Sequence, residues 1–200
     1  MTEAGQDELL AKLRTGAISL ALTYDLDIDP AHSTHQVLVD LPPRAIVAAD
    51  SPLAGRADGV SLAELAEWPL VLLDLPLSGE YFLSLFRAGG IEPRVAHRSP
   101  HLEVVRSLVA NGFGASLINI VPACATSLDG GRLVTLPLVG EHRPMRLGLA
   151  SRLSRFEART TAAFREHAVA ERGARSGEQG ARSEDEMRSG PSHRRPSSPA

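Results

Sequence analysis

The sequence predicts an α/β protein in which the chain crosses twice between two lobes. Between residues 60 and 119, short apolar runs alternate with amphipathic helical segments, as in parallel strands covered by helices. Extended segments at 27–49 and 132–150 flank this unit, and each contains apolar runs separated by prolines or polar residues. Two such crossings imply a hinge and a cleft between the lobes. Hydrophobic residues make up 43% of the 200 residues, which is enough to form a real core.

Composition excludes several classes of protein. The formal net charge of -3 gives the chain no basic footprint, so sequence-independent DNA binding by this chain alone is not expected. A single cysteine, Cys124, rules out an internal disulfide and fits a reducing compartment. No apolar run is long enough to span a bilayer, and the N-terminus lacks a signal-peptide core. We therefore expect a cytoplasmic protein with no membrane partner.

The first lobe is predicted to open with a short helix within residues 1–15, ended by Gly16. Leu9, Leu10 and Leu13 fall on one side of this helix. The nearly continuous apolar run 17–24 predicts a strand buried on both faces in a mostly parallel sheet.

The second lobe is predicted as a βαβα unit. Ser61 and Glu64 match a capping box, so a helix begins there, and it ends before Pro69. A strand at 70–73, a helix at 80–88 and a strand at 94–97 follow in order. This alternation predicts a parallel sheet with covering helices.

The next helix has marked ends. Ser99 is expected to be its N-cap and Pro100 its first helical residue, and Asn111-Gly112 favours a left-handed C-terminal end. A buried strand at 114–119 is predicted to follow.

A helix start of this kind presents free N–H groups, which suit an anion or a carboxylate. The strand ends near Asp74 and His97 and the helix start at Ser99 would all face the same cleft. The plainer interpretation, a capped helix packed on a sheet, also fits the spacing.

The C-terminal part is predicted as an amphipathic helix over 154–170, with Phe156, Thr160 and Phe164 on one side. From residue 171 the chain has almost no aliphatic residues, which predicts a disordered tail over 171–200.

Three motifs resemble the effector-binding domain of LysR-type transcriptional regulators. The order Ser-Pro-x-Leu-x-x-Val-x-x-Leu-Val-Ala-x-Gly-x-Gly-x-Ser-Leu at 99–117 is similar to that family's pocket-facing helix. The segment 51–56 resembles its "HPLA" turn, with Ser51 in place of histidine, and 9–22 resembles its "LxxGxlDlal" element, with Ser19 in place of aspartate. The resemblance covers roughly residues 5–168.

The resemblance implies a two-lobed, type II periplasmic-binding-protein-like effector domain with a truncated first lobe. The implied organisation is a partial first lobe at 1–45, a second lobe at 46–140, and a return strand and C-terminal helix of the first lobe at 141–170. It carries over eight effector-binding positions: Thr23, Tyr24, Leu77, Ser78, Ser99, Pro100, His101 and Asn119.

The resemblance also implies the partners. A small-molecule effector, such as a carboxylate or an aromatic acid, would bind between the lobes of a homo-oligomer or of a mixed oligomer with full-length regulators. Too few residues precede the first matched strand to form the family's winged helix-turn-helix, so we expect a truncated or mis-started gene product without its own DNA-binding module.

Two other classes stay open. A stand-alone solute-binding or dominant-negative partner protein would exchange with intact regulators. A dehydratase-like enzyme on the same fold would need an acid or base in the cleft, for which Asp74 and His101 are the candidates. We expect no enzyme and no cofactor. The histidine spacing matches no metal site, because Pro100 interrupts any helix joining His97 and His101.

Overall fold

The computed structural model describes residues 1–153 and 158–171. The chain divides into two compact units, residues 1–153 and 154–200. In the second unit the described residues form a helix over 159–171, and Phe164 on it is 57% exposed. The tail was predicted over 171–200, but Glu171 still belongs to this helix. Phe156 and residues 172–200 lie outside the described residues.

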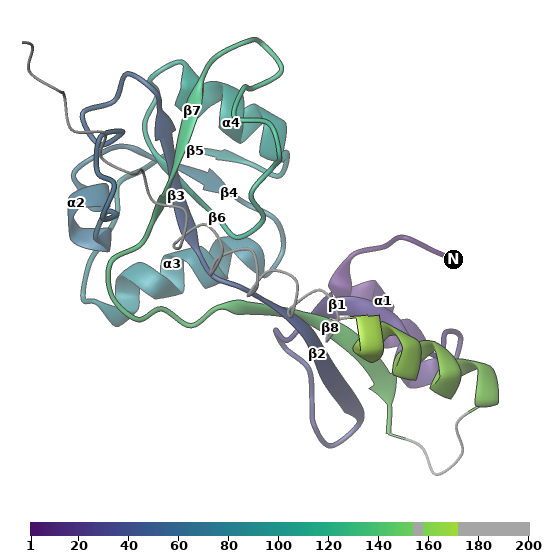
Figure 1. Cartoon of the computed structure of the whole chain (residues 1–200). Helices are drawn as coiled ribbons and strands as arrows, with labels where there is room; N and C mark the ends of the chain where they lie inside the picture. Colours follow the sequence, from purple (N-terminus) through teal and green to yellow (C-terminus); the bar gives the residue numbers. More distant parts are fainter. Residues whose placement is uncertain (154–157, 172–200) are drawn as a thin grey trace, which may run out of the picture. The chain divides into compact units, whose positions relative to one another are not determined.

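The first unit contains four helices and eight strands among its described residues (Figure 1). In chain order they are α1 (Gln6–Thr15), β1 (Ala21–Tyr24), β2 (Ser33–Leu41), β3 (Arg44–Ala48), α2 (Leu62–Ala66), β4 (Leu70–Leu73), α3 (Ser78–Ala88), β5 (Val95–Ser99), α4 (Leu102–Ala110), β6 (Ser116–Ile118), β7 (Leu133–Pro137) and β8 (Met145–Arg152).

The first lobe is a three-stranded antiparallel sheet in the order β1-β8-β2 with α1 packed on one face. The small core beneath α1 consists of Leu13, Ala21 and Ala150, with Leu9 and Leu10 partly buried against it. Gly16 ends α1, as predicted, and it adopts the left-handed conformation.

The prediction for the first strand is wrong in two respects. Regular pairing begins only at Ala21, and the partner β8 runs antiparallel to it. Because β1 is an edge strand with one exposed face, Leu22 keeps 55% of its surface in solvent. The apolar run therefore reflects packing beneath α1 rather than burial on both faces.

The second lobe is built on two sheets joined by backbone bridges. β4 pairs with β5 in parallel, as predicted, whereas β3 runs antiparallel to both β6 and β7. The Ala115 N–H donates to the Pro69 carbonyl (2.9 Å) and the Val71 N–H donates to the Ala115 carbonyl (2.8 Å). These bonds place β6 parallel to β4, so the expected parallel sheet exists over three strands, and the crossing strands add to it antiparallel.

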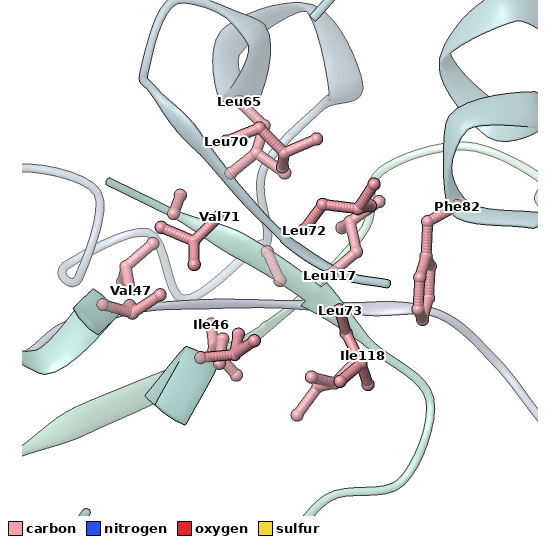
Figure 2. Packing of buried hydrophobic residues seen from close by; sticks show 14 of the residues in the cluster. Ile46, Val47, Leu65, Leu70, Val71, Leu72, Leu73, Phe82, Leu117 and Ile118 are labelled. Atoms are coloured by element: carbon pink, nitrogen blue, oxygen red, sulfur yellow. The ribbon is translucent and has the colours of Figure 1, made fainter. Parts of the chain in front are cut away.

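The main core lies between this sheet and helices α2, α3 and α4. Figure 2 shows Leu70, Val71, Leu72 and Leu73 of β4 at its centre, with side chains from β3 and β6 and from α3 around them. Phe82 of α3 is 1% exposed and belongs to this core.

Of the helices in the second lobe, α2 begins as predicted, whereas α3 and α4 do not. Ser61 and Glu64 form the predicted capping box of α2. The start of α4, however, was predicted two residues early: Ser99 ends β5, and the N-cap is His101. Ser99 stays extended because its carbonyl accepts the Asp74 N–H in the β4–β5 ladder (2.9 Å) and because it precedes a proline. Helix α3 likewise begins at Ser78, two residues before the predicted start.

The second crossing segment is held from both lobes. The Tyr81 hydroxyl on α3 donates to the Arg143 backbone carbonyl (2.7 Å), and the Arg143 guanidinium contacts the Asp25 carboxylate (3.1 Å) just after β1. The other oxygen of Asp25 accepts the backbone N–H of Arg146 (3.1 Å). We call Asp25, Tyr81 and Arg143 the crossing clamp.

We predict that Gly114→Ala destabilises the fold by about 2–4 kcal/mol, as backbone strain and overpacking add. Gly114 has a φ of 145°, and an added Cβ would overlap the backbone carbonyl of Pro69, the acceptor that joins β6 to β4. Gly112→Ala is the matched control, because its φ of 79° is unfavourable but no atom lies within 4 Å of an added Cβ. It is expected to cost about 1 kcal/mol in urea unfolding. Equal losses in the two variants would contradict the close approach at Gly114.

We predict that Tyr81→Phe lowers the free energy of unfolding at pH 8 by about 1 kcal/mol, the usual worth of one hydrogen bond. Burial raises the pKa of Tyr81 from 10.0 to about 12, so this residue favours the folded state fully below pH 10 and loses that contribution as the pH rises toward 12. The difference between the parent chain and the variant should therefore shrink when urea unfolding is repeated at pH 11. A difference that stays constant would mean that the hydroxyl is not buried as described.

Candidate functional site

The ends of three parallel strands meet at one edge of the second lobe. Leu73 of β4 pairs with Ser99 of β5, and the Ala115 bridge aligns β6 with the same strand, so that Asp74, Pro100 and Asn119 each follow a strand at this edge. In open α/β sheets ligands gather outside the carboxyl ends of strands. We call Asp74, Ser99, Pro100, His101 and Asn119 the strand-end cluster.

Ser99 shapes the start of α4. Its side chain is 7% exposed, and its hydroxyl oxygen accepts the His101 backbone N–H (3.2 Å). His101, the N-cap of α4, makes no side-chain capping hydrogen bond, so the first-turn N–H groups of α4 have no side-chain cap. Pro100 and His101 are both exposed. This helix start therefore offers hydrogen-bond donors and a partial positive charge to an anion.

Leu77 and Ser78 form the entry to α3, directly after β4. Leu77 has φ 71° and ψ -40°, and the Ser78 N–H donates to the Pro76 carbonyl (3.0 Å), which is the pattern of a γ-turn with positive φ. Such a turn is rare and strained for a residue with a Cβ. The Asp74 carboxylate lies against Gly79 in the first turn of α3, where a Cβ would overlap it, and it also pairs with Arg98 (3.2 Å).

Thr23 and Tyr24 end β1 in the first lobe. Thr23 is 5% exposed, and its carbonyl meets the Nε2 atom of His35 (3.2 Å). Tyr24 is half-buried against the main core, and this burial raises the pKa of its hydroxyl. Tyr24 pairs with Leu147 of β8. Met145, the first residue of β8, pairs with Leu41 of β2, lies within the main core and contacts the side-chain amide of Asn119.

The structure thus brings Ser99, Pro100, His101 and Asn119 to one sheet edge, with Leu77 and Ser78 at the start of the helix after β4. The crossing clamp was missed at the sequence level. Asp25 and Arg143 are separated by 118 residues, and no local pattern marks such a pair.

Residues 1–153 and 158–171 contain neither a candidate metal centre nor a candidate membrane-spanning helix. No group of three or more His, Cys, Asp or Glu side chains is arranged to hold a metal ion there. Within the same ranges no helix has the length and apolar character needed to cross a membrane.

The chain is similar to known proteins over most of its length. A family model described as the LysR substrate binding domain matches residues 1–173. The LysR family transcriptional regulator HinK from Pseudomonas aeruginosa is 31% identical, with a TM-score of 0.77, and the match covers 84% of this chain and 58% of HinK. The C-terminal domain of a probable LysR family regulator from Rhodococcus sp. RHA1 is also 31% identical, with a TM-score of 0.77, covering 83% of this chain and 81% of that domain.

A structure with lower sequence identity has the same fold. The BenM effector binding domain, solved with its effector benzoate, is 24% identical with a TM-score of 0.73, covering 88% of this chain and 78% of that domain. A comparison with curated protein sequences gave no significant match.

The chain spans only 58% of the length of HinK, so it corresponds to part of such a regulator. From the family match and the two-lobed geometry together, this chain belongs to the LysR substrate-binding domain family, the effector-binding domains of LysR-type transcriptional regulators, which have the type II periplasmic-binding-protein-like fold.

Proposed function

We propose that this chain binds a small carboxylate between its two lobes, and that this binding is the signal by which a LysR-type regulator controls transcription. The observation that supports the proposal best is the strand-end cluster, where the uncapped start of α4 lies beside the ends of three parallel strands. Fixed N–H groups at a helix start bind an anion without reorganisation.

The chemistry of the neighbouring residues fits a carboxylate with an apolar body. Ser99, His101 and the Asn119 amide supply polar groups at the strand ends, and Tyr24 and Leu77 supply apolar surface. A site with a few polar groups on an apolar wall is typical for a small ligand. BenM, whose domain shares this fold, has benzoate as its effector.

Ligand binding at this edge acts on the hinge by selecting one lobe arrangement. Met145 and Arg143 belong to the segment through which the chain returns to the first lobe, and both contact residues beside the strand-end cluster or on α3. A ligand that contacts both lobes binds the arrangement in which they meet more tightly, and it shifts the population by that difference in affinity.

We assign DNA reading to a separate module of the regulator, because the chain has a net charge of -3 and therefore no excess of positive charge for the DNA backbone. The proposed partners are therefore a small-molecule effector and further regulator chains, in a homo-oligomer or in a mixed oligomer. The proposed compartment is the cytoplasm, where such a regulator meets DNA.

Binding without turnover is the favoured activity. The Asp74 carboxylate, one of the two candidates for an acid or base, is paired with Arg98 and lies at the start of α3. This carboxylate already has a protein partner, so it is not presented alone to a ligand. His101, the other candidate, is exposed rather than enclosed.

We predict that a carboxylate raises the unfolding midpoint of the full chain. The panel contains benzoate, salicylate and short aliphatic acids, each paired with its uncharged amide. A ligand at 100 times its Kd stabilises the native state by about 2.7 kcal/mol, and its amide is expected to give a much smaller shift. The Kd of the best acid, from calorimetry, should rise at least tenfold, or about 1.4 kcal/mol, in Asn119→Ala.

His142→Ala is the control for a general effect of substitution, because His142 is partly buried and lies outside the strand-end cluster, where its ring nitrogen contacts the Val139 carbonyl (3.0 Å). Cooperative unfolding that no carboxylate shifts would contradict the proposal. Equal affinities in Asn119→Ala and His142→Ala would contradict the assignment of the site to the strand-end cluster.

A further inference from the structure

A hollow lies along the flank of α3, between that helix and the loop after β1. It encloses about 260 Å³, and the residues that line it come from both lobes and from the second crossing: Leu26, Asp27, Leu77, Glu80, Tyr81, Ser84, Leu85, Arg87 and Arg143. We call it the α3 groove. Of the eight effector positions expected from the sequence, it contains Leu77 and none of the others. Its volume, just below the usual range of roughly 300–1,000 Å³ for ligand pockets, suits a ligand of few heavy atoms.

Charges of both signs line the groove in equal number. Arg87 and Arg143 provide two guanidinium groups, and Asp27 and Glu80 provide two carboxylates. Each guanidinium is oriented by an ion pair through its Nη2 atom, Arg87 to Glu80 (2.8 Å) and Arg143 to Asp25 (3.1 Å). A guanidinium carries five N–H donors, so donors remain on both arginines for a carboxylate.

Asp27 is the acidic group that the fold leaves available. It is exposed, and among residues 1–153 and 158–171 no hydrogen bond or ion pair joins its carboxylate to another side chain. Arg143 lines the groove from the crossing segment. An acceptor for an ammonium group and donors for a carboxylate therefore line one small hollow.

Backbone strain is concentrated at the same place. Among the described residues, the non-glycine positions with positive φ are Asp27 (51°) and Leu77 (71°), and both line the α3 groove. Residues in such conformations cost about 1–3 kcal/mol and persist where the surrounding structure fixes them, often at ligand sites. Their coincidence at one hollow, from two different lobes, is independent of the charge pattern.

The floor of the groove is apolar. Tyr81 and Leu85 of α3 are 6% and 7% exposed, and Leu26 is partly buried against the main core. A short aliphatic side chain on this floor would leave water, which contributes about 25 cal/mol for each Å² buried.

We propose that the α3 groove is a binding site for a zwitterionic α-amino acid with a small aliphatic side chain. Its carboxylate meets Arg143 and Arg87, its ammonium meets Asp27, and its side chain lies on Tyr81 and Leu85. A lone anion or a lone cation would also meet a like charge in the lining of the groove, whereas the zwitterion pairs with both signs. The site is separate from the strand-end cluster and adds a second ligand to the proposed function.

The test uses the full chain and three probes of matched shape. L-leucine carries both charges, 4-methylpentanoate lacks the ammonium group, and 3-methylbutylamine lacks the carboxylate. Calorimetry with Asn119→Ala, in which the strand-end cluster is weakened, is expected to show saturable binding of L-leucine and at least tenfold weaker binding of the other two. Asp27→Asn keeps a residue that tolerates positive φ and removes the charge, so L-leucine affinity should fall at least tenfold with the unfolding midpoint unchanged.

Asp58→Asn is the matched control, because Asp58 is exposed and does not line the groove. Absence of saturable binding by L-leucine, L-valine and L-alanine would overturn the proposal, as would equal L-leucine affinity in Asp27→Asn and Asp58→Asn. Either result leaves the carboxylate response of the strand-end cluster untouched, since that response is measured with acids that lack an ammonium group and is read through Asn119→Ala.

Discussion

The structure depends most on the close backbone approach between Gly114 and Pro69. Only a residue without a Cβ fits there, and the approach allows the Ala115 N–H to reach the Pro69 carbonyl. That bond brings β6 alongside β4, which is already paired with β5. Without it, Asn119 would not follow a strand at the same edge as Ser99. One backbone contact therefore sets both the continuity of the second-lobe sheet and the composition of the candidate site.

Much of this fold is predictable from the sequence because its signals are local. The capping box at Ser61, the end of α1 at Gly16 and the apolar run of β4 each depend on a few consecutive residues, and all are confirmed. The start of α4 was misplaced because the fate of Ser99 is decided by a ladder bond to Asp74, 25 positions away. The N-cap preference of serine favours a helix start at Ser99, but the hydrogen bond in the sheet keeps this residue in a strand.

The site is predictable to a smaller degree. The family resemblance predicts that positions such as Ser99 and Asn119 bind the effector. The strand pairing then explains why these two residues lie at the same edge of the sheet. No local sequence pattern predicts the crossing clamp, because Asp25 and Arg143 are charged loop residues that meet only in the folded chain. The α3 groove escapes sequence analysis for the same reason: its walls come from three separate parts of the chain.

The two proposed sites are not independent, because Leu77 and the second crossing belong to both neighbourhoods. Leu77, the N-cap of α3, follows the strand that ends at Asp74 of the strand-end cluster and also lines the α3 groove. Arg143 lines the same groove, and Tyr81 and Asp25 hold Arg143 in place. A ligand that requires these groups in their present positions favours the lobe arrangement that provides them. If both ligands favour the same arrangement, each must strengthen the other by the same factor, since coupling between two binding sites is reciprocal. A regulator built in this way would report the joint presence of two metabolites through one hinge.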